Sequence, residues 1–234
     1  MAEIGLGYGS EFQLMRFLGH HRNELNKLIH EETNTDGTIE WLDFPYSDNK
    51  ISGDGEWKGI ECFSELLNYD DICEEWKKFW PQSGNAMNWD GIFKIKDAWH
   101  FVEAKAHKEE AFQECGATSN DSINKIDNAF EKTKKWLNIE NSNNWRNTKY
   151  YQLANRLAFI YFCNEICKIN AKLIYIGFVN GFKMEKDEIH SSDEWKEIWE
   201  EEMKCLGLDI EKMSQYIYFI HPDCNPKAKT KLVP

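Results

Sequence analysis

Proline and glycine are scarce in this chain of 234 residues, which has only 5 and 14 of them respectively. That scarcity excludes collagen-like repeats and flexible low-complexity linkers. No apolar run approaches the roughly 20 residues that cross a bilayer, and the N-terminus lacks the basic and apolar regions of a signal peptide. We therefore expect a cytoplasmic protein without a membrane partner.

Closely spaced cysteine pairs are also missing. Seven cysteines, an odd number, predict reduced thiols rather than a disulfide framework. No second Cys or His pair stands at zinc-finger spacing, and neither a P-loop nor a serine nucleophile elbow is present. These absences argue against zinc fingers, P-loop nucleotide-binding proteins and serine hydrolases of the α/β-hydrolase type.

Apolar and aromatic residues, in contrast, are plentiful. Hydrophobic residues make up 41% of the chain and aromatic residues 14%, with ten tryptophans. This composition supplies a substantial core and excludes disorder. No internal repeat or linker divides the chain, so we expect a single domain over residues 1–234.

The formal net charge of -12 argues against a nucleic-acid partner. The charge is unevenly distributed, however. Residues 185–212 hold eleven acids against four lysines, whereas residues 123–149 hold six bases against three acids. A locally basic face is compatible with phosphate binding, although such a face also occurs as ordinary solvated surface.

The periodicity of apolar residues predicts an α/β fold. Helical spacing covers residues 10–33, 58–68, 70–80, 121–137, 150–168 and 193–206, and strand patterns cover residues 38–44, 88–96, 99–107, 171–179 and 216–220. The run at 171–179 is almost continuously apolar, as in a strand buried on both faces. This order predicts a mixed central sheet flanked by helices, with a helical insertion before a hairpin.

The hairpin at 88–107 carries the chemistry. Side chains alternate between faces along a strand, so Glu103 and Lys105 share one face, together with His107. A turn at Asp97 and Ala98 would place Lys105 directly opposite Asp90, with Glu103 as the diagonal neighbour of Asp90. A slip of one residue would break this assignment of faces.

Two carboxylates beside a lysine suit a hard cation. Mg²⁺ takes oxygen ligands, commonly one or two carboxylates together with waters and substrate phosphate oxygens. A lysine there could stabilise charge in a transition state. The alternative for Asp90, Glu103 and Lys105 is a cross-strand salt bridge on an exposed sheet face.

The sequence around these residues resembles that of a known superfamily. Asp90 followed by Glu103-Ala104-Lys105 is similar to the motif of the PD-(D/E)xK phosphodiesterases, which have the restriction-endonuclease-like fold. The proline is displaced, at Pro81. The longer strings Trp89-Asp90-Gly91, Val102–His107 and Tyr150–Leu157 are similar to an uncharacterised bacterial family within that superfamily, over most of the chain.

The resemblance implies an αβββαβ core and a set of site residues. Asp90 and Glu103 would be ligands of Mg²⁺ or Mn²⁺, the Ala104 carbonyl a third ligand, and Lys105 the catalytic lysine. An acid on the first helix would complete the site. Glu24, beside the apolar Leu25 and Leu28, is our candidate, and Glu11 and Glu61 stay open. The alternative for each of them is an ordinary solvated helix acid.

Three further residues are candidates for substrate binding. Gln152 and Arg156, at i and i+4, share one helix face, and such residues support the site or grip phosphate in several branches of the superfamily. His107 extends the face of Glu103 and Lys105 and could aid proton transfer. The alternatives are polar helix surface for the first two and a structural histidine for the third.

Two functions from different classes follow. The leading hypothesis is a divalent-metal-dependent nuclease that hydrolyses nucleic acid, with DNA as the favoured substrate. The second is a non-catalytic protein of the same fold that serves as an interaction or structural subunit, which the acidic charge favours. A homodimer is compatible with either hypothesis.

Overall fold

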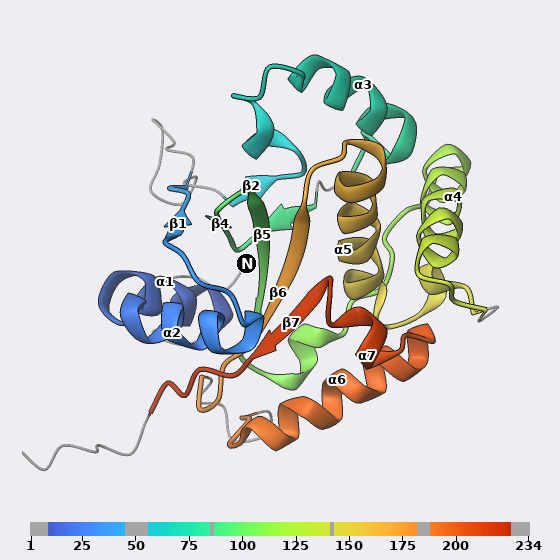
Figure 1. Cartoon of the computed structure of the whole chain (residues 1–234). Coiled ribbons are helices and arrows are strands. Elements are labelled where there is room, and N and C mark those ends of the chain that lie inside the picture. Colours follow the sequence, from blue (N-terminus) through green and yellow to red (C-terminus); the bar gives the residue numbers. More distant parts are fainter. Residues whose placement is uncertain (1–8, 45–55, 85–86, 141–142, 182–187, 226–234) are drawn as a thin grey trace, which may run out of the picture.

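A five-stranded mixed sheet forms the centre of the molecule (Figure 1). The computed structural model describes residues 9–44, 56–84, 87–140, 143–181 and 188–225. The sheet order is β1-β4-β5-β6-β7, and these strands span Ile39–Trp41, Gly91–Ile95, Ala98–Lys105, Ala171–Gly177 and Ile217–Ile220. Strands β1, β4 and β5 pair antiparallel, whereas β5, β6 and β7 pair parallel. A second, antiparallel pair joins β2 (Trp57–Lys58) to β3 (Asn88–Trp89).

Helices cover both faces of the central sheet (Figure 1). One face is covered by α1 (Ser10–His20) and α2 (Arg22–Thr33). The other face is covered by α5 (Tyr151–Tyr161) and α6 (Ser192–Leu206), and α3 (Tyr69–Phe79) and α4 (Asn120–Trp136) pack outside α5 and its extension. The short helix α7 (Ile210–Met213) leads into β7, and one π-helical turn, Phe162–Ile166, extends α5.

Alternation along the central strand β5 separates two apolar cores. All eight residues of β5 are buried. Trp99 and Phe101 pack into the larger core beneath α3 to α6, whereas Val102 and Ala104 pack into the smaller core beneath α1 and α2. A central strand with apolar layers on both sides is the arrangement that the buried runs of the sequence predict.

The predicted α/β class with a mixed sheet flanked by helices is confirmed, but three elements differ from expectation. The helix predicted over 10–33 is two helices, because the backbone of His21 (φ -130°, ψ 28°) leaves the helical conformation. The helix predicted over 58–68 is only a 3₁₀ turn at Glu61–Phe63. The strand predicted over 88–96 is interrupted at Asp90.

Two expectations about absences concern the described residues. All seven cysteines lie in this part of the chain and none is joined in a disulfide in the structure, and their reduced state stays a prediction. None of the helices that the structure describes combines the length and the apolarity that crossing a membrane requires.

Candidate active site

The register of the β4–β5 hairpin determines which side chains meet. The turn lies at Lys96 and Asp97, with Ile95 opposite Ala98 and Gly91 opposite Val102. The predicted turn at Asp97 and Ala98 is therefore wrong. Each β4 residue therefore pairs with a β5 residue two positions away from its predicted partner. Because side chains alternate between the two faces with a period of two, the residues predicted to share a face still share it.

Asp90 lies at the point where the chain leaves the hairpin ladder. Its amide donates to the Val102 carbonyl at 3.1 Å, and its Oδ2 accepts from the Ala104 amide at 2.6 Å. This second bond ties the Asp90 carboxylate to the backbone beside Glu103. Asp90 and Glu103 are thus neighbours across the two strands, whereas the prediction had set Lys105 opposite Asp90.

These residues share one cleft at the C-terminal end of β5. The cleft has a volume of about 350 Å³. Asp90, Glu103 and Lys105 line it, as does Ala104, so the predicted convergence of the triad is confirmed. The role of the Ala104 carbonyl as a ligand stays a prediction. The other lining residues are Ser10, Glu11, Glu56, Glu110, Phe112, Gln113 and Gln152.

Glu103 is held by two cations. Lys105 Nζ donates to Glu103 Oε1, and Arg156 Nε donates to Glu103 Oε2 at 2.7 Å. All three side chains are buried, with Lys105 6% and Arg156 7% exposed. The Arg156 guanidinium also lies 4.8 Å from the centre of the Trp89 ring. The contact with Trp89 holds Arg156 in place, and the buried ion pair with Arg156 in turn keeps the Glu103 carboxylate in one orientation.

The two acids of the triad have opposite pKa shifts. Burial, reinforced by the neighbouring charge of Glu103, raises the pKa of Asp90 well above its ordinary value. Burial would also raise the pKa of Glu103, but Arg156 and Lys105 outweigh it and lower that pKa. Burial acts to lower the pKa of Lys105, and the two carboxylates outweigh this effect and raise it. Near neutral pH the site therefore holds an ionised Glu103 beside a protonated Lys105.

The helix acid that lines the cleft is Glu11, not Glu24. Glu24 is exposed on α2 and is not among the residues that line the cleft, so our choice of it is wrong. Glu11, the second residue of α1, lines the cleft, and burial followed by the charge of Glu56 raises its pKa. The break at His21 separates the two helices, and the sequence gives no signal of that break. Glu61 lies in the 3₁₀ turn, also outside the cleft.

The predicted substrate-binding residues have three different positions. Gln152 lines the cleft, and its buried Oε1 accepts no hydrogen bond from the described residues. Arg156 pairs with Glu103 inside the protein, which agrees with the supporting role rather than with the phosphate-binding role that the sequence also allowed. His107 is half-buried, and its Nε2 lies 3.5 Å from Oε1 of Glu110, a residue of the cleft wall.

Two acids of the cleft wall were missed by sequence reasoning. Glu110 fixes the wall itself, because its Oε2 accepts from the Ala106 amide at 2.5 Å and its Oε1 accepts from Ser10 Oγ at 3.2 Å. Glu56 comes from the segment before β2. Its position depends on the long connection between β1 and β4, and nothing in its local sequence indicates a site.

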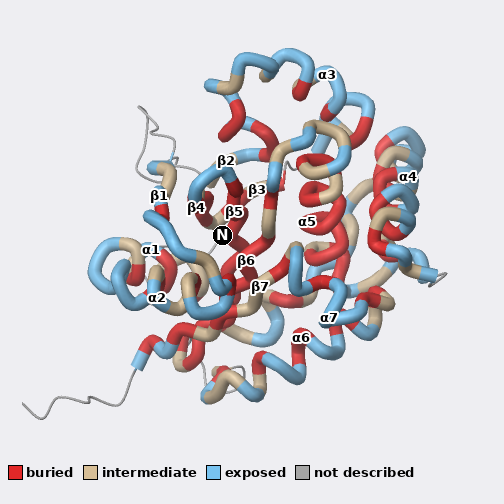
Figure 2. The backbone as a smooth tube through the Cα atoms, in the orientation of Figure 1, coloured by how far each residue is buried: buried red, intermediate tan, exposed pale blue. Residues whose placement is uncertain are grey.

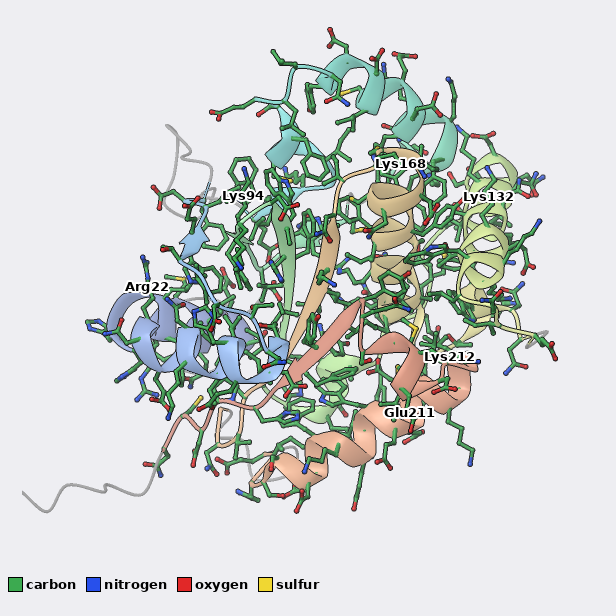
Figure 3. The ribbon with its side chains drawn as sticks, in the orientation of Figure 1. Arg22, Lys94, Lys132, Lys168, Glu211 and Lys212 are labelled. Atoms are coloured by element: carbon green, nitrogen blue, oxygen red, sulfur yellow. The ribbon has the colours of Figure 1, made fainter. Side chains whose placement is uncertain are left out.

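The basic residues of 123–149 are largely neutralised. Lys125, Lys134, Arg146 and Lys149 each pair with an acid: Asp121, Glu131, Asp127 and Glu201 respectively. Lys132 projects away from α4 into solvent (Figure 3). Lys149 lies 4.3 Å from the ring centre of Phe112, which lines the cleft. Of this basic segment, Lys149 is therefore the residue placed at the rim of the cleft.

The donor set fits a hydrated magnesium ion better than a closed metal site. Among the described residues, no group of three His, Cys, Asp or Glu side chains could hold an ion by itself. Mg²⁺ needs only one or two carboxylates, because it keeps several waters and takes phosphate oxygens of the substrate. Asp90 and Glu103 meet that requirement.

No family model, curated protein or solved structure matches the chain.

Proposed function

We propose that this protein is a divalent-metal-dependent phosphodiesterase that hydrolyses nucleic acid, with DNA as the favoured substrate. One observation carries the proposal: Asp90, Glu103 and Lys105 converge in a single cleft at the end of the central strand. Two carboxylates and a lysine provide metal ligation and charge stabilisation in one place.

The topology supports membership of the restriction-endonuclease-like group. The helices α1 and α2 are followed by three antiparallel strands, β1, β4 and β5, then by α4 and α5, and then by β6, parallel to β5. This order is compatible with an αβββαβ core whose second helix is α5. On this interpretation α3 and α4 are insertions, and α6 and β7 are additions after the core.

In this proposal Asp90 and Glu103 hold the cation, which when bound would polarise the phosphate and lower the pKa of a coordinated water. Asp90 would hold the cation in its ionised form, and because burial raises the pKa of Asp90, higher pH would favour this form. Arg156 keeps Glu103 ionised and oriented, and in that form the Glu103 carboxylate would hold the ion together with Asp90. Lys105 then places its ammonium group near the scissile phosphate and stabilises the negative charge that develops there.

The first test measures the metal apart from any activity. A ligand that binds only the folded protein adds RT ln(1 + [L]/Kd) to stability, about 2.7 kcal/mol at a hundredfold excess over Kd. Mn²⁺ should therefore raise the unfolding temperature of the wild type. The double variant Asp90→Asn, Glu103→Gln should lose this gain, whereas Glu24→Gln, an exposed acid outside the cleft, should keep it. An unchanged response of the double variant would place the ion elsewhere.

The second test measures hydrolysis of single- and double-stranded DNA and RNA in Mn²⁺ at low salt, where attraction between the few free bases and phosphate is least screened. Lys105→Met should abolish cleavage. Lys134→Met is the matched control, because Lys134 is also a buried lysine but lies on α4 and pairs with Glu131. Equal activity of both variants would indicate a contaminating nuclease. Absence of cleavage on every substrate would favour the non-catalytic interaction protein.

A further inference from the structure

A second hollow lies beside the candidate active site, between the α1–α2 pair and the end of β1. It has a volume of about 220 Å³. Met15 and Leu18 of α1 line one side of it, and Trp41 and Phe44 line the other. Met15 is 44% exposed and Phe44 37%, so the apolar lining is open to solvent. Figure 2 shows exposed stretches on both sides, at the junction of α1 and α2 and on the chain after β1. We call this hollow the aromatic groove.

The aromatic groove and the cleft lie at the same end of the sheet. Trp41 ends β1, and its ring lies 3.3 Å from the position that a Cβ atom on Gly91 would occupy. Gly91 directly follows Asp90, a residue of the cleft. On α1, Glu11 lines the cleft and Met15 lines the groove, about 6 Å further along the helix. A strand whose phosphate lies in the cleft would therefore reach the groove with a neighbouring nucleotide.

Two tryptophans fix the wall of the aromatic groove before any ligand binds. Trp41 Nε1 donates to Asn26 Oδ1 of α2 at 2.9 Å, which fixes the plane of the ring. Trp57 Nε1 donates to the Asp43 carbonyl at 3.1 Å, and Trp57 follows Glu56 of the cleft. This second bond ties the groove to the cleft wall. A flat ring can bind between walls already in place without the cost of ordering them.

Arg22 and Asp43 give the aromatic groove its polar groups. Arg22 lies on the surface of the α1–α2 pair (Figure 3), and its Nε donates to the Leu18 carbonyl at 2.9 Å. It takes part in none of the ion pairs of the described residues, so its terminal nitrogens can bind an anion. A guanidinium group binds two phosphate oxygens at once. The Asp43 carboxylate is exposed and can accept from the amino group of adenine, cytosine or guanine, which thymine lacks.

We propose that the aromatic groove is a nucleobase subsite, in which a base stacks on Trp41 and Phe44 while Arg22 binds the phosphate of the same nucleotide. The proposal rests on the proposed function, because it assigns the groove to the strand whose phosphodiester enters the cleft. A base can enter only when it is unpaired, so the substrate would be single-stranded or frayed here. Stacking needs no positive charge, and it gives affinity to a protein of net charge -12, which attracts phosphate weakly.

Binding to the aromatic groove can be measured without a metal ion or catalysis. The probe is deoxycytidine monophosphate in EDTA, followed by ¹H–¹⁵N NMR of the indole groups, with Trp41→Phe to assign the Trp41 signal. That signal should shift to saturation in the wild type. Phe44→Ala and Arg22→Gln should each weaken binding about tenfold. Leu67→Ala and Lys27→Gln are the matched controls, because both residues are exposed outside the groove, and these variants should bind as the wild type does.

Any of three results would overturn the proposal. One is a Trp41 signal that does not respond to the nucleotide. Another is an equal response to ribose 5-phosphate, which would show a phosphate site without a base. The third is a Trp41 signal that depends on protein concentration and not on nucleotide, which would assign the groove to a second copy of the chain. Thymidine monophosphate should bind more weakly, and equal binding would remove Asp43 from the subsite.

Cleavage assays separate this inference from the proposed function. With Mn²⁺, Phe44→Ala should raise KM for single-stranded DNA about tenfold, whereas Leu67→Ala should leave it unchanged. An unchanged KM for Phe44→Ala in an active enzyme would refute the subsite and leave the metal-dependent chemistry standing. A wild type that binds deoxycytidine monophosphate but cleaves no substrate would refute the proposed function instead, and the groove would then be a nucleotide-binding site without hydrolysis.

Discussion

Replacing Arg156 tests how much the buried ion pair at the centre of the site contributes to folding. Arg156→Met keeps most of the aliphatic length but removes the bond from Nε to Glu103 Oε2 and the contact with the Trp89 ring. Breaking a buried ion pair on one side typically costs 3–5 kcal/mol, because a charge is left buried without its partner. Lys105 still contacts Glu103, so we expect a loss near the lower limit, about 3 kcal/mol.

Arg146 provides a matched comparison. Arg146 Nε donates to Asp127 Oδ1 at 2.8 Å, nearly the distance of the Arg156 pair. The side chains of Arg146 and Asp127 are 20% and 36% exposed, however, against 7% and 3% for Arg156 and Glu103. Ion pairs near solvent contribute about 0–1 kcal/mol, so Arg146→Met should cost no more than this.

Urea denaturation followed by tryptophan fluorescence measures both variants. The argument requires a difference of about 2 kcal/mol or more in the free energy of unfolding, at equal slopes against denaturant. Equal losses for Arg156→Met and Arg146→Met would refute the claim that burial makes the first pair the more costly one to break.

Three further predictions concern packing and pH. Gly177→Ala would place its Cβ 2.6 Å from Trp195 and should cost about 1–3 kcal/mol by urea denaturation, whereas Gly116→Ala, with nothing within 4 Å, should change stability by less than about 0.5 kcal/mol. Burial lowers the pKa of His100 to about 4, so the unfolded chain binds the proton more readily than the folded protein. The free energy of unfolding should therefore fall by roughly 3 kcal/mol as the pH drops from about 6.5 to 4. His100→Gln should flatten this dependence, and an unaltered pH profile of the variant would contradict the reasoning. Because the pKa of Asp90 is raised, calorimetry should show a Mn²⁺ affinity that rises with pH, up to about tenfold per pH unit below that pKa. An affinity independent of pH between 5 and 8 would contradict the idea that Asp90 must lose a proton to bind the ion.

The local part of the site could be predicted from the sequence. Alternation within the hairpin placed Asp90, Glu103 and Lys105 on one face, and that assignment survived an incorrect turn because the shift of pairing was an even number of residues. Phe93 and Val102 likewise pack together in the core on the other side of the sheet. Strand periodicity is a local property, and neighbouring residues alone determine it.

The parts of the site that depend on long connections could not be predicted. Glu11 and Glu24 have similar helical surroundings, and only the break at His21 and the packing of α1 decide which one reaches the cleft. Arg156 and Gln152 share a helix face in the sequence, yet one pairs with Glu103 in the interior and the other lines the cleft.

The acidic lining of the cleft determines whether a cation or an anion can enter it first. Five acids and one lysine line it, and the acids come from α1, from the segment before β2, from the hairpin and from the 3₁₀ turn after β5. Such a field repels polyanions and attracts cations. If the proposed function is right, a phosphate ester would meet a barrier until a divalent ion had entered, so the concentration of free metal, rather than of the ester, would decide when the cleft becomes accessible.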